Sequence, residues 1–152
     1  MRVALVTLLC TLGLVAPGGT GARADDQTDV DKELKKFRGT WTFESVEAGG
    51  KEVPAAEFKG MTVTFEADKY TVKKCDDVIQ TAILKPDPSK SPKAFDVKVT
   101  DGPNKGSVML GIYEITGDTL KVCFDPDGKK QPTEFKTGCG SQTVVVHKCL
   151  KK

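Results

Sequence analysis

The stretch "KKFRGTWTFESVEAGGKEV", from Lys35 to Val53, contains the change of period that decides the fold. Before Gly39 the apolar side chains recur at helical spacing. After it, Trp41 and Phe43 alternate with polar residues, which is the period of two of a half-buried strand. A glycine directly after a helix is a common C-terminal cap. The stretch therefore predicts a short helix that ends at Gly39 and is followed at once by a β-strand.

The segment before Gly39 is expected to pack one face of its helix on the rest of the domain. Residues 25–33 are interpreted as a flexible tail and the start of this helix, with Asp29 or Asp31 as the N-cap. The apolar stripe consists of Val30, Leu34 and Phe37.

Residues 1–24 have the pattern of a secretory signal peptide. One early positive charge, Arg2, precedes an apolar run from Val3 to Ala16, and Ala22-Arg23-Ala24 forms a cleavage site of the A-x-A kind. The run is too short to serve as a stable membrane anchor. We therefore expect an exported protein, secreted or periplasmic, that loses residues 1–24.

The charge balance argues against nucleic acid and membrane surfaces as partners. Removal of the signal takes away two of the 23 basic residues and leaves them equal in number to the 21 acidic ones. A chain without net charge has no long-range attraction for polyanions. No later segment has the length of a membrane span, so we expect no membrane insertion of the mature chain.

Residues 34–152 read as one all-β domain. About eight short strands follow one another, separated by turn-rich segments, and Gly117-Asp118 is a tight hairpin signal. This spacing is typical of an antiparallel meander, a barrel or a sandwich. We predict an eight-stranded antiparallel up-and-down barrel with the short helix across one end. The strands after Phe43 centre on Met61–Phe65, Tyr70–Val72, Val78–Leu84, Phe95–Val99, Val108–Ile115, Leu120–Phe124 and Thr143–Cys149.

Four cysteines remain after removal of the signal, and an even number in an exported chain favours two disulfides. They are Cys75, Cys123, Cys139 and Cys149. In a meander, Cys123–Cys139 is the easiest bridge to close. Cys75–Cys149 then follows by elimination, although the meander puts these two residues at opposite ends. The alternative is that Cys123, between two apolar residues, is a buried free thiol.

Catalytic and metal-binding patterns are weak. The only histidine, His147, lies two residues from Cys149 on one strand, and a histidine near the rim of the domain is the simpler interpretation. Cys139 could add a third soft ligand, but no C-x-x-C or H-x-H pair is present. A calcium loop that starts at Asp125 would have Lys136 where a glutamate is needed. We expect no catalytic residue, no metal, no cofactor and no enzymatic activity.

Aromatic side chains fall on the apolar faces of the predicted strands. An eight-stranded barrel is just wide enough to be filled by side chains or to hold one small ligand. The aromatics therefore line a ligand pocket or form a packed core, and the sequence leaves both open. The candidate ligand-binding residues are Trp41, Phe65, Tyr70, Phe95 and Tyr113.

Several segments together resemble an uncharacterised family of secreted, lipocalin-like bacterial domains found mostly in planctomycetes. They are "FRGTWTFESVEAGGKEVP", "TFEADKYTV", "DPSKSPKAFDV", "GIYEITGDTLKVCF" and "QPTEF", within about residues 34–151. More distantly, Gly39-Thr40-Trp41 after a helix is similar to the G-x-W motif of lipocalin and calycin barrels, whose tryptophan closes one end. The lipocalin arginine that packs over it is replaced here by Lys148 or Lys151. The resemblance implies the barrel fold and no particular activity.

Two functions remain from different classes. The first is an exported binding protein for a small apolar ligand, which needs a cavity inside the barrel. The alternative is a protein-binding or inhibitor module with a filled core that uses the loops 86–93 and 126–141. The volume of the interior separates the two.

Overall fold

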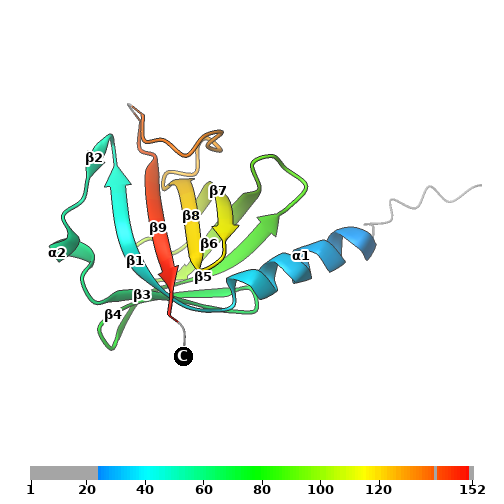
Figure 1. Cartoon of the computed structure of the whole chain (residues 1–152), viewed down its shortest axis with the longest axis horizontal. Coiled ribbons are helices and arrows are strands. Elements are labelled where there is room, and N and C mark those ends of the chain that lie inside the picture. Colours follow the sequence, from blue (N-terminus) through cyan, green and yellow to red (C-terminus); the bar gives the residue numbers. More distant parts are fainter. Residues whose placement is uncertain (1–23, 139, 151–152) are drawn as a thin grey trace, which may run out of the picture.

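The computed structural model describes residues 24–138 and 140–150, which form an N-terminal helix followed by a β-barrel that has a second, short helix at Ala55–Phe58 (Figure 1). The predicted signal peptide lies outside the described residues except for Ala24, which begins helix α1. No helix within the described part of the chain is long and apolar enough to cross a membrane. The elements are α1 (Ala24–Phe37), β1 (Gly39–Ala48), β2 (Lys51–Glu52), α2 (Ala55–Phe58), β3 (Met61–Glu66), β4 (Lys69–Lys74), β5 (Asp77–Asp87), β6 (Ala94–Asp101), β7 (Val108–Thr116), β8 (Thr119–Asp125) and β9 (Thr143–Cys149).

Eight strands close into an antiparallel barrel in sequential order, as the sequence predicted. β1 pairs with β3, each later strand pairs with the next, and β9 returns to β1. The closing ladder runs from Trp41 opposite Cys149 to Ala48 opposite Thr143. Full closure leaves the barrel without open sheet edges. The short β2 pairs only with the end of β1 and stands outside the ring.

The antiparallel order gives the barrel two distinct ends. The helix end carries α1, the β3–β4 turn, the β5–β6 loop and the β7–β8 turn. The loop end carries the β1–β2 turn, the β4–β5 turn, the β6–β7 loop and the long β8–β9 segment. These two names are used below.

Helix α1 is longer than the sequence predicted, because residues 25–28 are helical and do not form a tail. Polar pairs at helical spacing support this first part: Gln27 donates to Asp31 at 3.3 Å, and Lys32 pairs with Asp29 at 3.2 Å. The helix ends as expected at Phe37. Gly39 follows with a φ of 126°, a conformation that side-chain-bearing residues rarely adopt.

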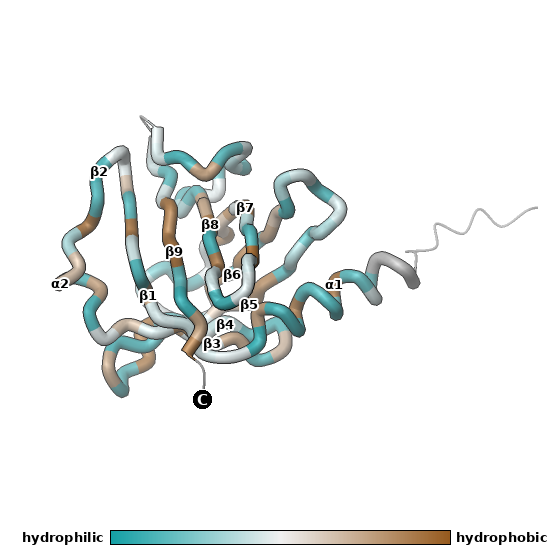
Figure 2. Tube along the Cα trace, viewed as in Figure 1, coloured by the Kyte–Doolittle hydropathy of each residue, from teal (hydrophilic) through white to brown (hydrophobic). Residues whose placement is uncertain are grey.

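The main core fills the barrel and follows the alternation seen in the sequence. Figure 2 shows hydrophobic and hydrophilic residues alternating along the strands and along α1. A second, smaller core lies on the outer face of the wall, where Ile112 of β7 and Cys123 of β8 are buried with Phe135 packed on them. Because residues 126–138 fold back over this wall, the strands β6 to β9 bury side chains on both faces.

The predicted disulfides are not present among the described residues. Cys75, Cys123 and Cys149 are free thiols, and Cys139 lies outside the described part of the chain. The bridge Cys75–Cys149 is prevented by position. The Cys75 N–H donates to the carbonyl of Gly60 at the loop end, whereas the Cys149 N–H donates to the carbonyl of Asp118 at the helix end. Cys123 is buried in the outer core, as the alternative interpretation predicted.

Candidate functional site: a cavity inside the barrel

The interior of the barrel contains one small apolar cavity of about 80 Å³. Its wall is built from inward-facing positions of the strands and from the end of α1. The wall residues are Phe37, Phe43, Phe65, Tyr70, Leu84, Phe95, Val97, Met109, Leu120, Val122, Phe124, Val145 and His147. Nearly all of these side chains are hydrocarbon, and none carries a formal charge at neutral pH, so the cavity suits an uncharged occupant.

Three of the five predicted ligand-binding residues lie on this wall. They are Phe65, Tyr70 and Phe95. The Phe65 and Tyr70 rings are neighbours on paired strands, with centroids 5.4 Å apart. Burial raises the pKa of the Tyr70 phenol to about 12, so its hydroxyl stays protonated in the physiological range.

Trp41 and Tyr113, the other two predicted residues, are buried but do not line the cavity. Both belong to the packing beneath α1. The Trp41 indole N–H donates to the carbonyl of Phe37 at 2.8 Å, and the Phe37 ring lies 4.8 Å from that of Tyr113. The helix therefore plugs this end of the barrel with Phe37, and the remaining free volume lies beyond the plug.

Phe43 and Met109 line the cavity although the sequence did not single them out. Both are only half-buried, as is Tyr70. The Phe43 ring packs against Phe58 of α2 with centroids 6.5 Å apart and against His147 at 4.6 Å. Half-buried side chains give way more readily than a packed core, so these residues form the movable part of the wall.

His147 is a wall residue that the sequence placed wrongly, near the rim of the domain. It is only 5% exposed and lies within the barrel, opposite Phe43 on β1. Burial lowers its pKa to about 4. A smaller, opposite effect comes from the Thr42 backbone, which favours the protonated form. The ring is therefore neutral at pH 7. Its Nδ1 atom is buried and has no hydrogen-bond partner within the described residues.

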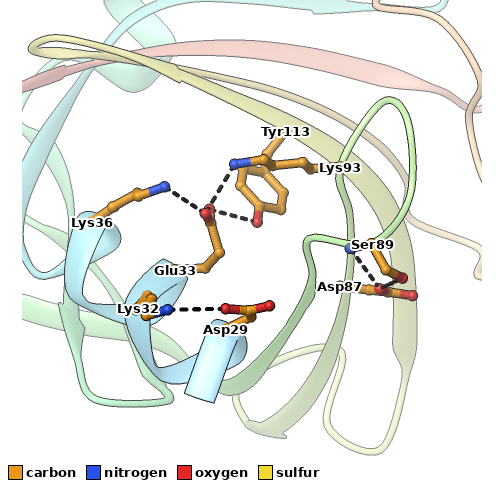
Figure 3. A network of polar contacts seen from close by, with 8 residues as sticks. All are labelled: Asp29, Lys32, Glu33, Lys36, Asp87, Ser89, Lys93 and Tyr113. Carbon is orange, nitrogen blue, oxygen red and sulfur yellow. Dashed lines mark hydrogen bonds and ion pairs between the residues drawn. The ribbon is translucent and has the colours of Figure 1, made fainter. Parts of the chain in front are cut away.

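A polar network at the helix end lies outside the cavity and was not predicted (Figure 3). The Glu33 carboxylate, only 5% exposed, accepts hydrogen bonds from Lys36 at 2.5 Å, Lys93 at 2.9 Å and the Tyr113 hydroxyl at 3.0 Å. Burial works to raise the Glu33 pKa, but these three donors outweigh it and hold the pKa below its ordinary value. Lys93, just before β6, and Tyr113 of β7 both donate to this one carboxylate of α1, so the network fastens the helix to the barrel.

Asp125 organises the long segment between β8 and β9. Its carboxylate, 4% exposed, accepts the backbone N–H groups of Asp127, Lys129 and Lys130 at 3.0 to 3.1 Å and the Ser141 hydroxyl at 2.7 Å. The Ser141 bond and these amides lower the pKa of Asp125 against the effect of burial. The segment after Asp125 is thus a turn centred on its carboxylate. Within the described residues, no group of three potential ligands is placed to hold a metal ion.

Comparison with known proteins adds no family to this picture. No family model matches the chain, and no curated protein matches it either. The structure by itself defines a closed, eight-stranded antiparallel barrel, compatible with the lipocalin and calycin fold, with a buried aromatic core. The resemblance to the planctomycete domain family stays a prediction.

Proposed function

We propose that this chain is an exported, lipocalin-like binding protein that takes up a small apolar ligand inside its barrel. The apolar cavity carries this proposal, because it is the one place where a closed barrel can shield a ligand from water. Export rests on the signal-peptide pattern of residues 1–24.

The size of the cavity limits the ligand. Sites for drug-sized molecules have volumes of roughly 300 to 1,000 Å³, and an apolar cavity of about 150 Å³ takes up benzene. At about 80 Å³, this cavity holds the head of a ligand or a very small molecule as it stands. A ring-sized ligand enters when the half-buried Phe43, Tyr70 and Met109 side chains move outward.

We expect binding without catalysis. The single histidine has the Phe43 ring against one side and the Thr42 backbone at one nitrogen. Its Nδ1 has no nucleophilic hydroxyl or thiol as a partner within the described residues. General-base chemistry would need such a partner within hydrogen-bond reach.

Methionine methyl groups offer a direct test, because Met109 lines the cavity and Met61 packs on the core away from it. Toluene is titrated into protein labelled with ¹³C at the methionine methyls. Binding in the cavity shifts and broadens the Met109 signal and leaves Met61 unchanged as an internal control. Unchanged spectra up to the solubility limit of toluene would overturn the proposal.

One observation favours the alternative of a protein-binding module. Residues 126–138 cover the outer core, and Asp125 accepts hydrogen bonds from the backbone of Lys129 in this segment and from the hydroxyl of Ser141. A pre-ordered loop binds a partner with a smaller entropic penalty than a flexible one. If toluene leaves Met109 unchanged, this loop becomes the surface to test, by scanning its exposed side chains in a pull-down from the periplasm or culture medium of the source cells.

A further inference from the structure

The cavity contains a hydrogen-bond acceptor that the protein leaves unused. His147 lines the cavity and is 5% exposed, yet its Nδ1 has no partner within the described residues. Most buried polar side-chain atoms in native proteins are hydrogen-bonded, and an exception calls for an explanation. A ligand group that completes this bond is one such explanation, because His147 lines an apolar cavity inside the barrel.

The protonation of the ring decides which kind of group fits. The hydrogen bond with the Thr42 backbone favours the protonated form of the imidazole, so the partner is the Thr42 carbonyl and the ring nitrogen is the donor. A neutral imidazole has one N–H donor and one acceptor nitrogen. No described residue hydrogen-bonds to Nδ1, and when Nδ1 is the acceptor nitrogen, a donor from the ligand completes its bond.

The rest of the wall excludes charged ligands. No lysine, arginine, aspartate or glutamate lines the cavity, so neither a carboxylate nor an ammonium group would find a counter-ion there. The hydroxyl of Tyr70 is the one other polar group of the wall side chains. A neutral hydroxyl on an apolar body matches this set of groups.

We propose, building on the proposed function, that the ligand is a small neutral alcohol or phenol whose hydroxyl donates its hydrogen to Nδ1 of His147. The aromatic wall, with Phe65 and Phe95, packs against the apolar body of the ligand. The orientation is then fixed, with the hydroxyl toward β9 and the body toward β3 and β6.

Phenol and toluene form a matched pair of probes, because a hydroxyl replaces a methyl group on the same ring. An apolar cavity without an acceptor favours toluene, since the phenol hydroxyl would lose its bonds to water. We expect the reverse in the wild type, with phenol binding about tenfold more tightly than toluene by NMR titration or calorimetry. His147→Leu should abolish this preference. Tyr70→Phe removes the other polar group of the wall and should change the affinity for both probes alike, so that phenol still binds more tightly than toluene.

The outcomes separate this inference from the proposed function. If toluene binds as tightly as phenol, the hydroxyl assignment is overturned and the apolar site stands. If neither probe binds, the proposed function itself fails. If Tyr70→Phe loses the preference for phenol and His147→Leu keeps it, the assignment to His147 is also overturned.

A second measurement does not depend on any variant being folded. The chain contains one histidine, so untagged, ¹⁵N-labelled protein gives a single pair of imidazole nitrogen signals. Phenol should move the unprotonated nitrogen signal to lower frequency, as acceptance of a hydrogen bond does, and toluene should leave it in place. An unmoved signal at saturating phenol would overturn the proposal.

Discussion

The carboxylate of Glu33 in α1 and the hydroxyl of Tyr113 in β7 are joined by a buried hydrogen bond of 3.0 Å across 80 positions of sequence. The bond ties the helix to β7 (Figure 3). The Tyr113 ring also packs on the Phe37 ring, with centroids 4.8 Å apart. Burial and the neighbouring Glu33 carboxylate raise the pKa of Tyr113 far above its ordinary value, so the hydroxyl remains the donor at any physiological pH. The position of α1, and with it the position of the Phe37 ring at one end of the cavity, depends on this contact.

Tyr113→Phe should therefore lower the free energy of unfolding by about 1 to 3 kcal/mol, since it removes a hydrogen bond to a charged and buried acceptor. Urea denaturation followed by Trp41 fluorescence measures the change. Tyr70→Phe is the matched control, because no described residue hydrogen-bonds to the Tyr70 hydroxyl, and it should change stability by less than about 0.5 kcal/mol. Equal losses in both variants would mean that the Glu33 contact contributes nothing.

Acid should destabilise the protein in two pH ranges. The folded-state pKa of His147 lies at about 4, below the ordinary 6.5, so between these values the unfolded chain binds the extra proton. Stability therefore falls as the pH drops from 6.5 to 4, by up to roughly 3 kcal/mol. The Glu33 and Asp125 carboxylates have lowered pKa values, so they add a further loss as the pH falls through the ordinary pKa of carboxyl groups and below it.

Two variants show which residue causes the loss of stability in each pH range. Unfolding free energies of His147→Leu, measured in urea at several pH values, should show a flat profile between pH 6.5 and about 5, where the carboxyl groups do not yet titrate. Glu33→Gln should keep the fall in unfolding free energy that His147 causes and should show a smaller fall than the wild type at lower pH. A wild-type profile that is already flat between pH 6.5 and 4 would contradict the burial of a neutral histidine.

The barrel could be predicted because its signals are local. The switch of period at Gly39, the alternation of Trp41 and Phe43, and the Gly117-Asp118 turn each act within a few residues, and all agree with one topology. The site was harder to predict, because its side chains come from segments that are far apart in the sequence. Phe37 plugs the helix end and so removes Trp41 and Tyr113 from the cavity wall.

The burial of His147 and the Glu33 network had no clear sequence signal. The sequence around Glu33 does not indicate burial, since only its three-dimensional neighbours Lys93 and Tyr113 make a buried carboxylate stable. His147 alternates with Val145 and Cys149 toward the barrel interior. That alternation could have indicated an inward-facing histidine, had the apolar face of β9 been followed to its end.

Asp125→Ala should release the long segment that covers the outer core. The variant leaves the amides of Lys129 and Lys130 and the Ser141 hydroxyl without their acceptor, and we expect a loss of about 2 to 4 kcal/mol. Hydrogen exchange at Lys129 and Lys130 should accelerate more than exchange in β3. Asp127→Asn, an exposed neighbour, serves as the control with an expected change of less than about 0.5 kcal/mol. Slow exchange retained in Asp125→Ala would show that other contacts hold the segment.

Thiol labelling should distinguish the three described cysteines in the native protein. Cys75 is exposed and should react with iodoacetamide first, and Cys149 is half-buried and should follow. Cys123 is fully buried with a pKa raised by burial, so it should react only after unfolding. Peptide mapping by mass spectrometry, without prior reduction, gives the order. A Cys75 that stays unlabelled until a reductant is added would mean that it is held in a disulfide.

Gly111 makes room for the Phe95 ring that lines the cavity. The two residues face each other on β7 and β6, and a Cβ added at Gly111 would lie 2.7 Å from Cε1 of Phe95 and 2.8 Å from the Cys123 carbonyl oxygen. Gly111→Ala should therefore displace the ring toward the cavity and cost about 1 to 3 kcal/mol. Toluene binding, followed at Met109, should weaken in the same variant because the cavity becomes smaller.

A double-mutant cycle with Phe95→Leu isolates this contact. The shorter side chain removes the clash, so Gly111→Ala should cost less in the Phe95→Leu background than in the wild type, with a coupling of about 1 kcal/mol. Gly138→Ala is the control, because an added Cβ there meets no atom within 4 Å, and it should be close to neutral. Additive losses in the cycle would place the cost of Gly111→Ala at the Cys123 carbonyl alone and leave the Phe95 ring, and the cavity, where they are.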